Sequence, residues 1–162
     1  MKEFFKLNWL KIVIVFVVIG LDLLTKEIFY GQEYSIIPYL IGVRAVNGLN
    51  TGGAYSMLSD KTWLLILVSV VFIIIICVYD LIVKHKSTTY SIGVGFIVGG
   101  AIGNLVDRIF LGGVRDFIFF EFYKTFPTFN VADSFLFVGT CIVIIYAIFI
   151  YKPKEKEKIN GK

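Results

Sequence analysis

The chain has 162 residues, of which 57% are hydrophobic, 17% aromatic and 17% charged, and its mean hydropathy is +0.83. A soluble domain is about 45–50% apolar and about 25% charged, and near this length it buries only about 70% of its unfolded surface. The composition therefore excludes an ordinary water-soluble globule. The 16 Lys and Arg against 12 Asp and Glu give a net charge of +4, and its meaning depends on where the charges lie.

Cysteine and histidine are too scarce for several common hydrolase chemistries. Cys77 and Cys141 each lie inside a long apolar run, so neither a disulfide framework nor a cysteine metal site is supported. His85 is the single histidine, which makes a His-ligated zinc or a Ser-His-Asp triad very hard to build. We therefore expect no metal and no cofactor.

Four apolar stretches are long enough to cross a bilayer, which takes about 20 residues for roughly 30 Å of hydrocarbon. They are residues 9–29, 62–79, 88–106 and 134–151. Open strands would leave backbone groups unpaired in lipid, and no small-residue cleavage site follows the first stretch, so we interpret it as a retained span. The sequence thus predicts a mainly α membrane protein, with residues 1–162 as one domain and a short basic tail from about residue 152.

The distribution of basic residues predicts the orientation. Ten of the 16 Lys and Arg residues fall on the side that holds both termini and the loop between the second and third spans. By the positive-inside rule both termini are cytoplasmic. The basic tail is then a solvated or headgroup-facing end, and nucleic acid is not an expected partner.

Two segments lie on the opposite, extracytoplasmic side. Within residues 31–60, short alternating pieces such as VRAV, broken by Asn47-Gly48 and Gly52-Gly53, suggest a small hairpin or sheet. Within residues 111–131, the run DFIFFEFYKTF is typical of a strip in the membrane interface. We expect these segments to roof the extracytoplasmic face.

Ionisable residues gather at the outer ends of spans one, three and four. A charge near the bilayer centre costs about 2.5–3.5 kcal/mol, so these positions are candidates for function. They are Asp22, Lys26, Asp107, Arg108, Asp116 and Asp133. Asp80, at the cytoplasmic end of span two, is instead expected to be a solvated terminal charge.

The third span carries two patterns. Gly95, Gly99 and Gly103 recur every four residues, a spacing that lets a neighbouring helix approach closely. Three polar side chains spaced i, i+3 and i+4 lie on one face near its outer end: Asn104, Asp107 and Arg108. The last two could simply anchor the helix at the headgroups, whereas Asn104 lies one turn deeper and needs a partner or a wet cavity.

Each remaining acid also has a structural interpretation. Asp22 and Lys26 are i, i+4 neighbours, which favours an ion pair. Asp133 or Ser134 could cap the fourth span, and Asp116 could be an ordinary loop acid. Because spans three and four run antiparallel, however, Asp107, Asp116 and Asp133 should lie at similar depth.

Two facing carboxylates would form a catalytic site. At about 4 Å and an effective dielectric near 20 they repel by roughly 4 kcal/mol, so the pair holds one proton at neutral pH. The ionised acid can activate water against a peptide carbonyl, and the protonated acid can donate to the carbonyl oxygen and to the leaving amine. This is aspartic-protease chemistry, and the residues alone leave open which two acids form the pair.

Five motifs in order resemble the bacterial lipoprotein signal peptidase family, signal peptidase II. They are DLLTK from Asp22, NTGGAYS from Asn50, GGAIGNLVDR from Gly99, VRDF from Val114 and FNVADS from Phe129. The resemblance covers nearly the whole chain apart from the tails. It implies four transmembrane helices with a small extracytoplasmic β-cradle and an interfacial helix. It also implies an endopeptidase that removes signal peptides from prolipoproteins just before a diacylglyceryl-modified cysteine.

The resemblance also implies roles for individual residues. Asp116 and Asp133 match the catalytic pair, and Asp22 and Lys26 match a structural pair. The matches to the pocket for substrate and for the cyclic peptide inhibitor globomycin are Asn50, Asn104, Asp107, Arg108 and Asn130. Tyr55 and Arg115 depart from the family pattern, and Arg115 could alter the charge at Asp116. The implied partners are lipidated prolipoproteins and membrane lipid, and we expect a monomer in the bacterial inner membrane.

Two other classes of protein remain open. A small transporter or channel subunit also places polar groups inside its spans, but those groups should continue through the midplane rather than cluster at one end. A purely structural scaffold with ion-paired helix ends would show no activity on lipidated precursors.

Overall fold

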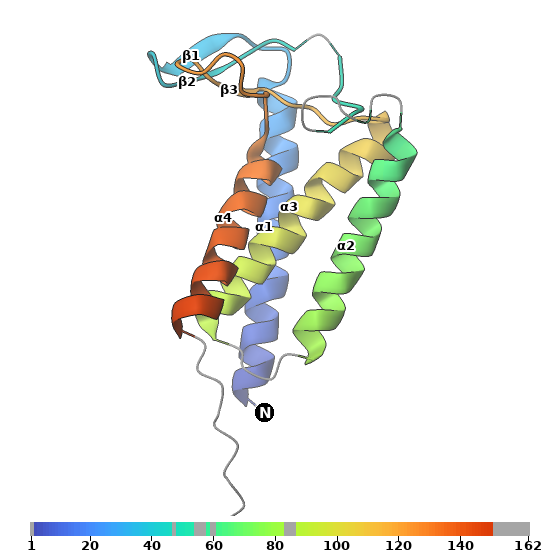
Figure 1. The fold of residues 1–162 in the computed structure, drawn as a ribbon, viewed down its shortest axis with the longest axis vertical. Helices are drawn as coiled ribbons and strands as arrows, with labels where there is room; N and C mark the ends of the chain where they lie inside the picture. The colour runs from blue at the N-terminus through green and yellow to red at the C-terminus, as the bar shows by residue number, and fades with distance from the viewer. Residues whose placement is uncertain (1, 47, 54–57, 59–60, 83–86, 151–162) are drawn as a thin grey trace, which may run out of the picture.

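Four long helices form the body of the protein. The computed structural model describes residues 2–46, 48–53, 58, 61–82 and 87–150. The helices are α1 (Lys2–Phe29), α2 (Thr62–Ile82), α3 (Thr88–Leu111) and α4 (Val131–Ile145), and α4 continues into a π-helical turn, η2 (Tyr146–Ile150) (Figure 1). All four spans are long and apolar enough to cross a membrane. The prediction of a multi-pass membrane protein is therefore confirmed.

Helix α3 is the centre of the bundle and packs against the other three helices. A Cβ atom added at Gly95 would lie 2.7 Å from Ile14 Cγ2, and one at Gly99 would lie 2.7 Å from Val18 Cβ. At Gly103 it would lie 2.5 Å from Asp22 Oδ2. The predicted close packing is thus confirmed, and its partner is α1.

A small sheet covers one end of the bundle, away from the N-terminus (Figure 1). Its strands are β1 (Tyr34–Ile37), β2 (Ile41–Val43) and β3 (Ile118–Phe120), antiparallel in the order β1-β2-β3. Strand β3 comes from the aromatic run after α3, so both predicted external segments contribute. The expected VRAV strand is wrong beyond Val43, because β2 ends there. Outside the four spans, the described residues contain no further helix, and the implied interfacial helix is not among them.

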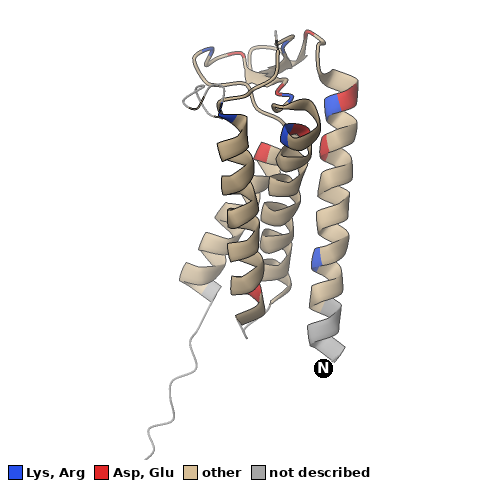
Figure 2. Ribbon diagram, turned by 90° about the vertical axis from the view of Figure 1, so that its right-hand side faces the viewer, with Lys and Arg blue, Asp and Glu red and all other residues tan. Residues whose placement is uncertain are grey.

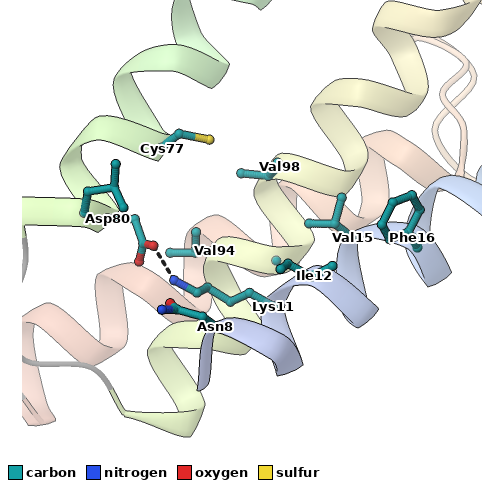
Figure 3. A pocket seen from close by; sticks show the side chains of 11 residues that line it. Asn8, Lys11, Ile12, Val15, Phe16, Cys77, Asp80, Val94 and Val98 are labelled. Atoms are coloured by element: carbon teal, nitrogen blue, oxygen red, sulfur yellow. Dashed lines mark hydrogen bonds and ion pairs between the residues drawn. The ribbon is translucent and has the colours of Figure 1, made fainter. Parts of the chain in front are cut away.

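The expectation that Asp80 is a solvated terminal charge is wrong. Its side chain is buried, and its carboxylate forms an ion pair with Lys11 of α1 (Figure 3). The pair lies in a cavity of about 390 Å³ whose lining is otherwise mostly apolar, between α1, α2 and α3. Charges in such surroundings are stabilised only by a partner, which the sequence of one helix does not show.

Charged residues lie toward the two ends of the helices and leave their middle parts uncharged (Figure 2). Their outward faces carry large exposed apolar side chains, such as Phe16, Phe72 and Phe137. This distribution is typical of a helical bundle whose middle part is surrounded by lipid. His85, Tyr55 and the basic tail from about residue 152 lie outside the described residues.

Two alanine substitutions test the packing of α1 on α3. We expect Gly99→Ala to destabilise the protein by about 1–3 kcal/mol, because the new methyl group would overlap Val18. Gly20→Ala, on the same pair of helices, meets nothing within 4 Å and should leave stability unchanged or slightly raised. Thermal unfolding in detergent measures both, and equal effects would contradict this account of the glycine face.

Candidate active site

The segment after α3 places Asp116 two residues before strand β3. Gly112 ends the helix in the left-handed conformation at φ 79°, which glycine adopts without steric cost. Val114 then pairs with Asn50 in an isolated β-bridge, with N···O distances of 2.8 and 3.0 Å. Asp116 follows two residues later and is only 5% exposed. It is therefore not an ordinary loop acid.

The first turn of α4 places Asp133. Asn130 is the N-cap: its Oδ1 accepts from the Asp133 amide at 3.0 Å, and Asp133 Oδ2 accepts from the Asn130 amide at 3.1 Å. The expectation that Asp133 or Ser134 caps this helix is corrected by this reciprocal capping box. Helix α4 begins at Val131, earlier than predicted, because the asparagine caps from one turn upstream.

In every described hydrogen bond at Asp116 and Asp133, an asparagine N–H group donates to the carboxylate. Asp116 accepts from Asn50 Nδ2 at 2.8 Å and from Asn130 Nδ2 at 2.7 Å. Asp133 accepts from Asn104 Nδ2 at 2.7 Å, besides the capping amide of Asn130. Asn130 thus contacts both acids and is itself fully buried. A carboxylate is an acceptor when ionised, so the surroundings suit two acids held in fixed orientations.

Both acids line one cavity of about 240 Å³. Asn50, Asn104 and Arg108 line it as well, together with an aromatic wall that includes Phe126 and Phe129. The two phenylalanines and Asp133 also line an adjoining cavity of about 550 Å³, which is almost wholly apolar. The acids therefore lie where a polar chamber meets an apolar one. Phe126 and Phe129 were not predicted as site residues, although both belong to motifs that the sequence analysis identified, DFIFFEFYKTF and FNVADS.

Asp116 changes its protonation state near neutral pH. Burial and the negative charge of Asp133 raise the pKa of Asp116 to about 6, against the lowering effects of hydrogen bonds from Asn50 and Asn130 and of the charge of Lys26. A group with a pKa in this range can hold or release a proton under physiological conditions.

The remaining charged residues form a buried cluster behind the cavity. Lys26 pairs with Asp22 at 2.7 Å, which confirms the predicted ion pair, and lies 3.4 Å from Asp107. Asp107 also accepts from the guanidinium of Arg115 at 2.9 Å and from its backbone amide at 3.0 Å. Asp107 is 1% exposed and is not among the residues that line the cavity.

Arg115, which precedes Asp116 in the chain, directs its side chain to other acids of this cluster. Its guanidinium binds Asp107 and Glu27, the latter at 3.0 Å, and these contacts raise its pKa. The positive charge of Arg115 is therefore engaged with two other acids. Tyr55, the second departure from the family pattern, lies outside the described residues.

A four-helix membrane fold in which two acids, Asp116 buried and Asp133 partly buried, line one chamber defines an integral membrane protein with an acid–base site. The family model for signal peptidase (SPase) II matches residues 14–149. The lipoprotein signal peptidase of Enterococcus faecalis is 38% identical over 149 residues, which are 88% of this chain and 89% of the relative. That of Caldanaerobacter subterraneus is 39% identical over 143 residues, 85% and 95% of the two chains. The chain therefore belongs to the signal peptidase II family and is a membrane peptidase.

Solved structures agree with this assignment. A bacterial membrane enzyme determined at 2.3 Å by the in meso method superposes with a TM-score of 0.77 and 27% identity, over 91% of this chain and 94% of the other. A second such enzyme, determined at 1.9 Å, gives a TM-score of 0.75 and 26% identity.

Among the described residues, no group of three His, Cys, Asp or Glu side chains could hold a metal ion.

The raised pKa of Asp116 predicts a pH-dependent stability. Its usual value is 3.8 and its folded value about 6, so its stabilising contribution is fully present below 3.8 and is lost as pH rises through about 6. Asp116→Asn cannot ionise. The stability of this variant relative to wild type should therefore increase between about pH 4 and pH 8, by on the order of 3 kcal/mol.

Thermal unfolding in detergent across this pH range measures the difference. Glu33→Gln, which replaces an exposed loop residue, is the control and should change the stability by less than about 0.5 kcal/mol. A difference between Asp116→Asn and wild type that stays constant with pH would show that Asp116 titrates normally.

Proposed function

We propose that this membrane peptidase is an aspartic endopeptidase with Asp116 and Asp133 as its catalytic pair. It removes signal peptides from diacylglyceryl-modified prolipoproteins and cuts just before the lipidated cysteine. The observation that carries the proposal is that both carboxylates line one cavity and are bridged by the side chain and backbone of Asn130. The names of the relatives, lipoprotein signal peptidases, support the substrate.

The chemistry follows from the two protonation states of the pair. The ionised acid takes a proton from water as the water oxygen attacks the scissile carbonyl carbon, and the other acid donates its proton to the carbonyl oxygen. When the tetrahedral intermediate collapses, the bond from carbon to nitrogen breaks and the amine receives a proton. Because each acid is held by amide donors, both are oriented before the substrate binds.

The lining of the site suits a substrate that is partly peptide and partly lipid. Asn50, Asn104 and Arg108 offer hydrogen bonds to a peptide backbone in the polar chamber, and buried Asn130 orients the acids behind them. The apolar chamber beside Asp133 suits aliphatic chains. Asp107, Asp22 and Lys26 support the site from behind. Globomycin would compete for this same chamber.

The setting in the membrane completes the proposal. The distribution of basic residues along the sequence supports cytoplasmic termini, with the paired acids near the outer leaflet. The diacylglyceryl chains then remain in the bilayer while the scissile bond reaches the acids, so that the lipid anchor supplies positioning. The protein acts as a single domain and as a monomer. A transporter is disfavoured, because the polar cavity lies at one end of the bundle rather than across its midplane.

Removal of either acid tests the catalytic pair. Asp116→Asn and Asp133→Asn should fold and should lower the rate of prolipoprotein cleavage by at least about 100-fold, the scale of general acid–base catalysis. A mobility-shift assay with purified protein and a diacylglyceryl prolipoprotein measures the rate, and globomycin should abolish the wild-type shift. Glu33→Gln is the matched control and should cleave normally. Substantial cleavage by both asparagine variants would disprove the pair.

Removal of the lipid tests substrate recognition. A prolipoprotein whose cysteine lacks the diacylglyceryl group should be cleaved with kcat/KM at least about tenfold lower, because the anchor positions the scissile bond. The same detergent assay, run with modified and unmodified substrate side by side, measures the ratio. Equal kcat/KM values would show that the peptide alone is recognised.

A further inference from the structure

The buried ammonium of Lys26 has one contact that its ion pairs do not explain. The side chain is 0% exposed, and its Nζ lies 2.7 Å from Asp22 Oδ2 and 3.4 Å from Asp107 Oδ2. A third contact, at 3.0 Å, reaches Asn104 Oδ1 on α3. Asn104 in turn donates to Asp133. Lys26 is therefore two hydrogen bonds away from one member of the proposed catalytic pair.

The chemistry of these groups fixes the direction of the chain. An ammonium only donates, so the atom of Asn104 that faces Lys26 is the amide oxygen. The same oxygen accepts from Asn130 Nδ2 at 3.0 Å. With its oxygen held by two donors, the amide of Asn104 must present its Nδ2 group to Asp133. A carboxylate partner at that position requires this orientation and no other.

The acids of the cluster do not depend on Lys26 alone. Asp22 also accepts from the backbone amide of Ala132 at 2.9 Å, and Asp107 is held by Arg115 through three hydrogen bonds. The ammonium has three N–H donors, and Asn104 Oδ1 is the acceptor it reaches besides the two acids. The contact with Asn104 extends its influence from α1 and α3 to the first turn of α4.

Lys26 also acts on Asp116 through its charge. The groups whose charges bear on this acid come from three elements: Asp133 from α4 raises its pKa, while Lys26 from α1 lowers it. Arg108 of α3 lines the same cavity, and Asp107 of α3 lies behind it beside Lys26. Loss of Lys26 therefore removes a positive charge that favours the ionised form of the pair.

We propose that Lys26 is a positioning residue for catalysis: its ammonium fixes the amide of Asn104, which in turn holds Asp133 in its working orientation. This inference rests on the proposed function, because it assumes that Asp116 and Asp133 are the catalytic pair. Lys26 itself does not touch the substrate.

Two substitutions separate the donor from the charge. Lys26→Met removes both, and kcat should fall by about tenfold to a hundredfold, because a small misplacement of a reacting group costs up to about 100-fold in rate. KM should stay within about twofold, because no residue that lines the cavity is replaced. Lys26→Gln keeps a donor for Asn104 and should retain more kcat than the methionine variant. In both, the acid limb of the pH profile of kcat/KM should move to higher pH, since the charge is gone.

A paired variant excludes simple unfolding as the cause. Asp22→Asn combined with Lys26→Met removes both charges of the ion pair, so that no unpaired partner remains, and it should show the same loss of kcat. The matched control is Lys11→Met combined with Asp80→Asn, which removes the buried ion pair between α1 and α2. That control should lose some thermal stability but keep kcat and the pH profile of the wild type.

The outcomes distinguish this inference from the proposed function. Cleavage is measured per folded molecule on diacylglyceryl prolipoprotein from pH 5 to pH 9, beside the two asparagine variants of the catalytic pair. Wild-type kcat and an unshifted pH profile in the folded Lys26 variants would overturn the positioning role while the catalytic pair stands. Normal cleavage by Asp116→Asn and Asp133→Asn would overturn the proposed function itself.

Discussion

The hydrogen bonds that asparagine side chains donate to the carboxylates of Asp116 and Asp133 are the interactions on which the rest of this structure depends. A carboxylate among apolar helices is costly unless donors surround it. Here Asn50, Asn104 and Asn130 supply those donors from a loop, from α3 and from the start of α4. An amide carries no charge, so it holds an acid in place without forcing it to ionise. This leaves the charge state of the pair free to respond to its neighbours.

The glycine face of α3 makes this arrangement possible. Because Gly99 and Gly103 have no side chain, α1 lies close enough to α3 for Asp22 and Lys26 to reach the ends of α3 and α4. A larger residue would separate the helices and leave these charges without partners in a low dielectric. The close packing of α1 on α3 and the pairing of the buried charges therefore depend on the same few residues.

The position of the site suits its proposed substrate. The acids lie just before β3 and in the first turn of α4, where a polar chamber adjoins an apolar one. Water and a peptide bond can enter the first chamber, while aliphatic groups fit the second. A site at mid-depth would lack water, and one wholly outside the bundle would lose the anchoring that lipid provides.

Much of this protein could be predicted from its sequence, because apolar length and periodicity are local properties. The four spans, the glycine face and the Asp22–Lys26 pair all follow from residues close together in the chain. Only the tertiary structure decided the rest, since each remaining feature joins distant segments. Asp80 meets Lys11 across 69 residues, Asn130 rather than Asp133 caps α4, and Asp107 turns to Arg115 behind the cavity. A buried polar group takes whichever partner the fold brings within hydrogen-bonding distance, and that choice is made in three dimensions.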